Sequence, residues 1–222
     1  MVVEIPHLRA DAQRNLERIL EAAREVFARD GLDASVADVA ERAGVGTATI
    51  FRRFPTKDDL VAAVIEYELE AFGVRALDAA DSDDPGAAIE DFMTSVIASF
   101  IEDRCFCEAS GSELFDRPRI QELVAGLTGS IELLLTRAQA AGAIRDDVVA
   151  ADIGFLVSAV GQAGLRLEQT APGAWRRYAE IVLGGLRPEG ARPLAHKPPT
   201  PQQFHEAKTR RTPPSPPPKS AA

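Results

Sequence analysis

The sequence has few of the residues from which disulfide frameworks and metal centres are built. Its 222 residues include two cysteines and three histidines. Cys105 and Cys107 are too close together to join distant elements, and the histidines lie near the two ends of the chain. A four-ligand zinc site needs more than this set. We therefore expect no metal site and no disulfide, and we interpret both cysteines as structural or incidental, which suits a reducing cytoplasm.

Long apolar runs and enzyme motifs are also missing. No continuous apolar stretch approaches the roughly 18 residues that a transmembrane helix needs. The first residues of the chain lack the apolar segment of a signal peptide. We find no Gly-rich phosphate loop, no cluster of histidine with carboxylates and no nucleophile elbow. These absences predict a cytoplasmic protein that neither enters a membrane nor acts as an enzyme, and that needs no cofactor.

Positive charge is scarce overall, and a net charge of −9 argues at first against a nucleic-acid-binding protein. The charges are unevenly distributed. Residues 1–57 carry nine basic and nine acidic side chains, residues 58–187 carry ten and 23, and residues 188–222 carry six and two. The stretch 42–57 holds four basic residues and no acidic one. A local basic face of this kind could bind phosphates, while the acidic remainder limits non-specific binding.

Apolar residues recur at helical spacing along almost the whole chain, and no segment alternates as a β-strand does, so an all-α protein is expected. Three N-terminal helices should form a helix-turn-helix domain with an N-terminal arm, over residues 1–57. Residues 58–187 should form a second helical domain, with helices that start near residues 85 and 118 and others that span about 148–169 and 172–187. Ten of the last 35 residues are proline, which predicts a disordered tail over 188–222.

The segment from Ser35 to Phe54 carries the strongest functional pattern. Ser35 and Asp38 have the spacing of a capping box at the start of a short helix, and Gly44 permits a turn after it. A second short helix follows and should end before a proline. Two short helices joined by a glycine-containing turn predict a helix-turn-helix, whose second helix enters the major groove of DNA. On that helix Ile50 and Phe54 should face inward, and small, polar or basic residues outward.

The run from Ile19 to Ala23, continued through Phe27 and Gly31 and then from Val36 to Leu60, resembles the DNA-binding domain of the TetR family of transcriptional regulators. The resemblance implies that the second short helix faces DNA and that the lysine opening the next helix contacts a phosphate with help from the helix N-terminus. With the basic stretch and the outward small residues added, the predicted DNA contacts are Arg42, Thr47, Ala48, Thr49, Phe51, Arg52, Arg53 and Lys57.

Two positions depart from the family's common pattern. Gly46 stands where a serine usually caps the recognition helix, and glycine is a weaker cap by a few tenths of a kcal/mol. Phe51 stands where a tyrosine is common, so a hydroxyl that could reach a phosphate is missing. The grip on DNA should therefore depend mainly on Arg52, Arg53 and Lys57.

Beyond Leu60 the resemblance implies a helical domain that dimerises and often encloses a ligand pocket. Inward-facing aromatic and sulfur side chains could line that pocket, although ordinary core packing is the alternative: Phe72, Phe92, Met93, Phe100, Phe106 and Phe115. Acidic residues near them would favour a cationic or hydrogen-bond-donating ligand if they turned inward, and otherwise form a solvated face: Glu102, Asp103, Glu108, Glu113 and Glu122. Apolar and small residues of the last two helices are the predicted dimer interface, unless they pack within one subunit: Leu156, Val160, Gly164, Trp175, Tyr178 and Val182.

Together these features predict a homodimeric repressor that a small-molecule effector releases from DNA. Two-fold symmetry would place two recognition helices about 34 Å apart, so the operator should be palindromic. The alternative is a DNA-bound protein-interaction module that recruits a partner through its acidic domain or its Pro-rich tail and has no small ligand.

Overall fold

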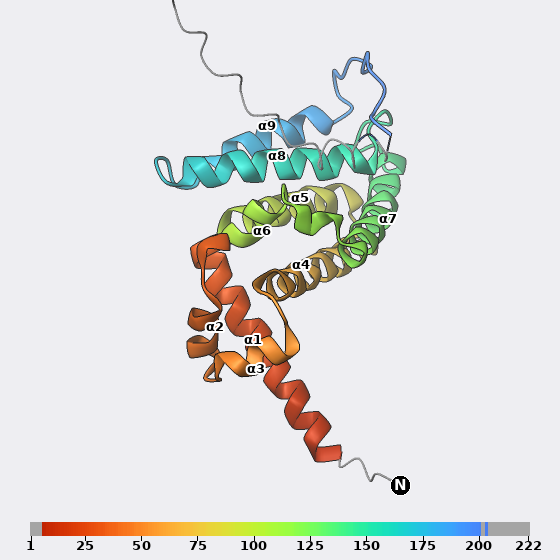
Figure 1. The fold of residues 1–222 in the computed structure, drawn as a ribbon. Helices are drawn as coiled ribbons and strands as arrows, with labels where there is room; N and C mark the ends of the chain where they lie inside the picture. Colours follow the sequence, from red (N-terminus) through yellow and green to blue (C-terminus); the bar gives the residue numbers. More distant parts are fainter. Residues whose placement is uncertain (1–5, 201–202, 204–222) are drawn as a thin grey trace, which may run out of the picture.

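The structure is a computed structural model that describes residues 6–200 and residue 203. As predicted, the described part contains α-helices and no β-strand (Figure 1). The elements in chain order are α1 (Pro6–Asp30), the 3₁₀-helix η1 (Gly31–Asp33), α2 (Val36–Ala43), α3 (Thr47–Arg53), α4 (Lys57–Ala80), α5 (Pro85–Glu102), α6 (Arg104–Ala109), the 3₁₀-helix η2 (Glu113–Asp116), α7 (Pro118–Ala140), α8 (Ala150–Glu168) and α9 (Trp175–Leu186).

Short-range signals in the sequence set the helix ends near the turn of the helix-turn-helix. The Ser35 side chain accepts from the Asp38 N–H while the Asp38 carboxylate accepts from the Ser35 N–H, which completes the predicted capping box of α2. Thr56 and Asp59 form the same box at the start of α4. Gly44 ends α2 with φ of 66°, a left-handed conformation that glycine adopts without strain. The predicted turn is therefore confirmed.

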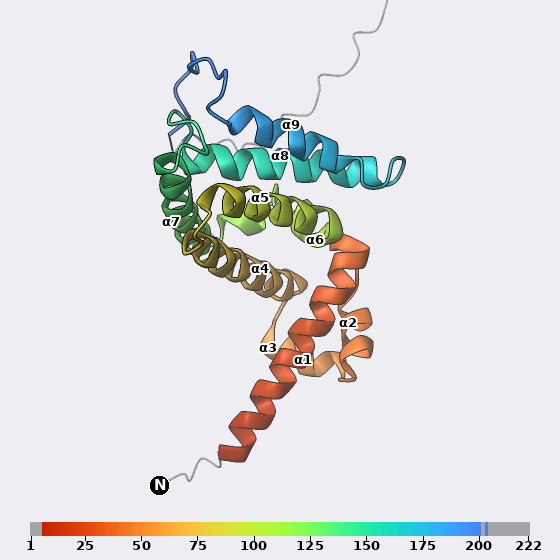
Figure 2. The same cartoon turned by 180° about the vertical axis from the view of Figure 1, so that it is seen from behind.

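The first three helices pack around a small apolar centre. Ala23 of α1, Val39 of α2 and Ile50 of α3 are fully buried there. Helix α1 crosses this unit and extends past α3, so that its N-terminal turns project from the molecule on the side of α3 (Figures 1 and 2). Helix α1 begins at Pro6, ten residues before Leu16, which packs against the core. Residues 1–5 of the predicted arm lie outside the described residues.

The remaining helices form a layered bundle. Helix α4 packs against α7, and α5 packs against α8. Helices α8 and α9 form the outer layer, on the side of the bundle away from α4 (Figure 2). Gly161 lets α8 approach α5, because a side chain there would meet Phe100. The Pro85 and Pro118 positions open α5 and α7 as first-turn prolines, as expected.

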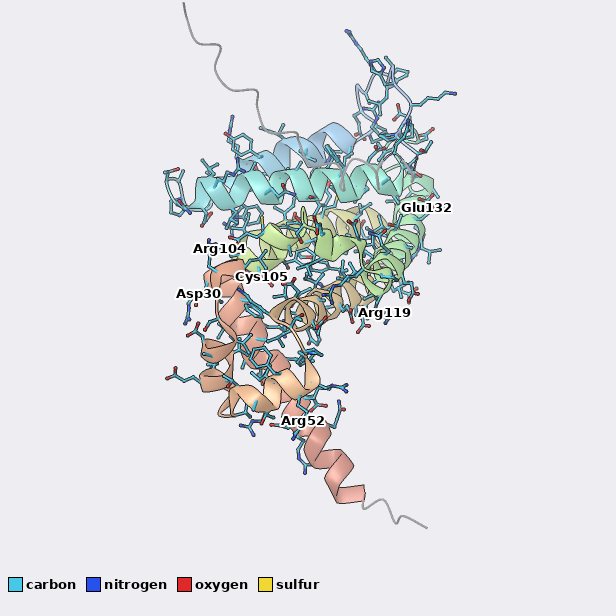
Figure 3. The ribbon with its side chains drawn as sticks, viewed as in Figure 1. Asp30, Arg52, Arg104, Cys105, Arg119 and Glu132 are labelled. Atoms are coloured by element: carbon cyan, nitrogen blue, oxygen red, sulfur yellow. The ribbon has the colours of Figure 1, made fainter. Side chains whose placement is uncertain are left out.

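The two units meet where the end of α1 reaches α6 (Figure 3). Glu108 of α6 accepts a hydrogen bond from the Leu32 N–H at 2.8 Å. The carbonyl of the same Leu32 accepts from the Lys57 Nζ, at the start of α4. Gly31 has φ of 66°, and a Cβ atom on it would lie 2.5 Å from the Glu108 carboxylate. Leu32 is therefore held through its N–H by Glu108 of the helical domain and through its carbonyl by Lys57 at the start of α4.

Residues 188–200 form no helix or strand. The Leu194 N–H donates to the Asp147 carboxylate at 2.8 Å, and Arg145 donates to the Arg192 carbonyl, so part of this segment follows the loop between α7 and α8. The hydrogen bonds from Arg145 and from the Leu194 N–H lower the pKa of Asp147 to about 2. The predicted disorder of the rest of the tail concerns residues that, apart from 203, lie outside the described part.

No helix of the described residues is long and apolar enough to cross a membrane. The same part of the chain has no group of three or more His, Cys, Asp and Glu side chains placed to hold a metal ion.

Candidate nucleic-acid interface

Helix α3 is held by its inner face and presents its outer face to solvent. Ile50 is fully buried and Phe54 is 8% exposed, as the sequence predicted. The cap position Gly46 makes no side-chain hydrogen bond, and its carbonyl accepts from the Thr49 N–H at 2.9 Å. A helix of seven residues with a weak cap is therefore positioned mainly by these two apolar anchors.

The predicted contact residues of α3 lie on its accessible side. Five are exposed and one, Thr49, is half-buried: Thr47, Ala48, Thr49, Phe51, Arg52 and Arg53. Phe51 is 46% exposed. The ion pairs among the described residues do not include Arg52 or Arg53. The outer face of α3 thus offers hydroxyls, methyl groups, one aromatic ring and two guanidinium groups.

Arg42 and Lys57 are more engaged within the protein than their sequence context suggested. Arg42 forms an exposed ion pair with Glu25 of α1, at 2.5 Å between Nη2 and Oε2. Lys57 is half-buried and donates to the Leu32 carbonyl. An ammonium group has three donors, so this bond leaves Lys57 able to bind a phosphate as well. The predicted DNA contacts of both residues stay predictions.

A groove of about 490 Å³ separates α3 from the projecting part of α1. Its lining joins three residues of α3 to four of α1: Thr49, Arg52 and Arg53 with Gln13, Asn15, Leu16 and Ile19. Arg52 lies where α3 meets the projecting half of α1 (Figure 3). Sequence reasoning missed Gln13 and Asn15, because the first helix was interpreted only through its apolar face. Polar residues on the turn before that face could have indicated them.

In the helical domain the six predicted pocket residues are all buried, with exposures of 7% or less. Phe106 of α6 packs against three of the other five. Its ring centroid lies 5.3 Å from that of Phe72, 4.9 Å from Phe100 and 6.1 Å from Phe115, each in an edge-to-face arrangement. Phe92 and Met93 are also buried, on the same helix α5 as Phe100. The rings fill the space between the helices as core, and the predicted pocket stays a prediction.

The acidic residues near this cluster mostly face away from it. Glu102, Glu113 and Glu122 are exposed, and Glu108 binds the Leu32 N–H. Asp103 is the inward one: its carboxylate accepts from the Phe106 N–H at 2.8 Å, and burial raises its pKa to about 6.

The two cysteines lie in the same short helix as Phe106. Burial raises the pKa of Cys105 to about 12 and also raises that of Cys107, and nearby carboxylates add to both effects. Both side chains therefore stay as thiols at neutral pH, which agrees with the structural interpretation and not with a reactive nucleophile.

Two of the predicted dimer residues are turned into the subunit. Trp175 is 5% exposed, and a Cβ atom on Gly164 would lie 2.8 Å from Ile101 and 3.0 Å from the Trp175 Cβ. These two residues pack α8 and α9 against their own core, so their assignment to a surface is wrong. Tyr178 is 52% exposed, while Leu156, Val160 and Val182 are half-buried. The outer faces instead expose Phe155 and Ile181, which sequence reasoning missed.

Comparison with known proteins identifies both parts of the chain. Residues 19–64 match the pattern of bacterial regulatory proteins of the tetR family, and residues 84–188 match the C-terminal domain of SbtR-like transcriptional regulators. The TetR transcription regulatory protein from Mycobacterium vanbaalenii is 33% identical. The match covers 81% of this chain and 99% of that chain, with a TM-score of 0.61.

Other similarities are shorter or more distant. The HTH-type transcriptional regulator LuxR of Vibrio harveyi is 38% identical over 72 residues, which is 32% of this chain and 35% of that protein. The chain thus matches about a third of the length of its curated relatives. RolR, solved with the ligand resorcinol, has the same fold at 20% identity and a TM-score of 0.54, over 86% of this chain and all of RolR. The chain belongs to the TetR family of transcriptional regulators, which are helix-turn-helix DNA-binding proteins and not enzymes.

Proposed function

We propose that the protein is a homodimeric repressor, which binds a palindromic operator and leaves it when a small-molecule effector enters the helical domain. The observation that carries this proposal is the outer face of α3, where Arg52 and Arg53 stand beside exposed hydroxyl, methyl and aromatic groups. Since it acts on chromosomal DNA, the proposed location is the cytoplasm.

In the proposed complex the recognition helix lies in the major groove. Arg52 and Arg53 supply the charge that binds phosphates or guanine edges, and the Thr47 hydroxyl can bond a base or the backbone. Ala48 and Phe51 are apolar groups of the kind that contact thymine methyls. Phe51 in place of the common tyrosine would then exchange a phosphate contact for a base contact.

The proposed dimer interface is the outer face of α8 and α9. Phe155 is 60% exposed and Ile181 is 59% exposed, beside the exposed Tyr178. Open space surrounds the positions where Gly154 and Gly184 would carry a Cβ atom, so a second pair of helices could approach closely. Apolar side chains this exposed favour burial against a copy of the same face, which a two-fold axis provides.

The proposed effector site is the region around Phe106. RolR, which has the same fold, was solved in complex with the ligand resorcinol. A ligand that separates the rings around Phe106 would displace α6, and Glu108 of that helix holds Leu32 of the DNA-binding unit. Effector and DNA would then weaken each other's binding by the same factor, as linkage requires.

The test is selection of bound duplexes from a random-sequence DNA pool with the purified full-length protein. We expect enrichment of two inverted half-sites, with centres about 10 base pairs apart. Failure to enrich any motif would contradict the proposal, and a motif without two-fold symmetry would contradict the dimer. The selected duplex then serves in a screen for small molecules that lower its affinity, and a null result in that screen would sink the effector mechanism only.

A further inference from the structure

The groove between α1 and α3 includes side chains of α1 that are not among the predicted DNA contacts. We propose that this groove binds a phosphodiester strand of the duplex, with the amides of Gln13 and Asn15 as donors to its phosphate oxygens. The inference rests on the proposed DNA-binding function and adds to it a contact from α1, beside the contacts of α3.

The lining of the groove has the chemistry that a nucleic-acid backbone requires. Arg52 and Arg53 bring two guanidinium groups, and none of the described side chains that line the groove is a carboxylate. Thr49 adds a hydroxyl from the half-buried side of α3. Most hydrogen bonds between proteins and DNA go to phosphates and sugars, from side chains of these types.

The amide groups on α1 complete the donor set opposite the arginines. The Gln13 amide donates one N–H to Glu17 at 3.0 Å, which orients it and leaves its second N–H for a ligand. Asn15 is half-exposed at the same end of the groove and carries two N–H donors. The apolar floor of Leu16 and Ile19 suits the carbon face of a deoxyribose.

The direction of α1 would bring its N-terminal turns next to a duplex bound on α3. The helix extends beyond α3 in both views (Figures 1 and 2), and Arg52 lies beside its projecting part (Figure 3). The turns from Pro6 to Gln13 add about 12 Å at 1.5 Å per residue. A duplex seated on α3 must therefore pass beside the projecting part of α1. A strand next to the one read by α3 fits between the two helices.

The experiment compares Gln13→Ala and Asn15→Ala with the parent protein on the duplex selected from the random pool. Alanine favours helix at both positions, so the fold should be retained. We expect each variant to bind about fivefold to 100-fold more weakly, because one hydrogen bond is lost in each of the two half-sites. Because both side chains are neutral, the dependence of affinity on salt should stay that of the parent. Gln169→Ala, an exposed amide at the end of α8, is the matched control and should bind like the parent.

A second measurement locates the strand. Neutral methylphosphonates replace the phosphates of the selected duplex one at a time. At the groove phosphates the replacement should weaken the parent more than it weakens Asn15→Ala, since that variant has already lost one of the donors to them while Arg52 and Arg53 remain. If the parent binds the duplex and both variants bind within twofold of it, the inference is overturned while the proposed function stands. If the parent binds no duplex, both fail.

Discussion

The DNA-binding unit and the helical domain differ in net charge and in the surroundings of two phenylalanines, Phe51 and Phe106. The first unit carries no net charge over residues 1–57. On the seven-residue helix α3 it exposes Phe51 and two arginines, which take part in none of the ion pairs of the described residues. The second is acidic and packs Phe72, Phe100 and Phe115 around Phe106 in a buried cluster. The proposed function accounts for this difference: DNA would bind an exposed face of α3, whereas an effector would enter between buried rings.

The largest expected effect comes from exchanging the same residue in the two regions. Phe106→Ala should lower the free energy of unfolding by about 3–5 kcal/mol, because it removes a buried ring from the centre of the cluster. Phe51→Ala, at an exposed position, should change it by less than about 0.5 kcal/mol and should weaken DNA binding instead. Urea denaturation of both variants measures this. Equal losses of stability would break the comparison.

The acidic interior gives a pH-dependent prediction. Burial raises the pKa of Asp103 from 3.8 to about 6. This group therefore favours folding most below pH 4, and that contribution is lost as the pH rises through about 6. Asp103→Asn keeps an acceptor for the Phe106 N–H and removes the buried charge. The variant should be more stable than the parent by about 3 kcal/mol at pH 7.5, at 1.36 kcal/mol per pKa unit.

The same advantage should disappear near pH 4, where the carboxyl of the folded parent is protonated. Denaturation curves at pH 7.5 and pH 4 separate this cause from a general effect of the substitution. An advantage of the same size at both pH values would mean that the charge of Asp103 is not the cause.

The smallest effect concerns Arg42, whose charge is paired with a carboxylate of α1. Glu25 pairs with Arg42 on the exposed surface. Glu25→Ala should release that guanidinium and tighten binding to the selected duplex about twofold to threefold, the range of an exposed ion pair. Glu21→Ala, on the same helix one turn earlier, is a suitable control. Weaker binding by Glu25→Ala would show that the pair positions Arg42 for its contact.

Short-range features of the fold were predictable from the sequence, and long-range pairings were not. The capping box of Ser35 and Asp38, and the turn at Gly44, depend on residues that are neighbours in the chain. The bond between Lys57 and Leu32 and the pair of Arg42 with Glu25 depend on how helices cross, which periodicity does not encode. Gly164 and Trp175 were misplaced for the same reason. Their small and large side chains fit each other within one subunit as well as they would fit a partner.

The most direct test of the account is the salt dependence of binding to the selected duplex, for the parent and for the double variant Arg52→Ala/Arg53→Ala. For a dimer that loses two phosphate contacts in each half-site, the slope of log affinity against log salt should become shallower by about four units. The pair Arg176→Ala/Arg177→Ala on α9 should keep the parent's slope. A double variant at positions 52 and 53 with the affinity and slope of the parent would contradict the placement of DNA on α3.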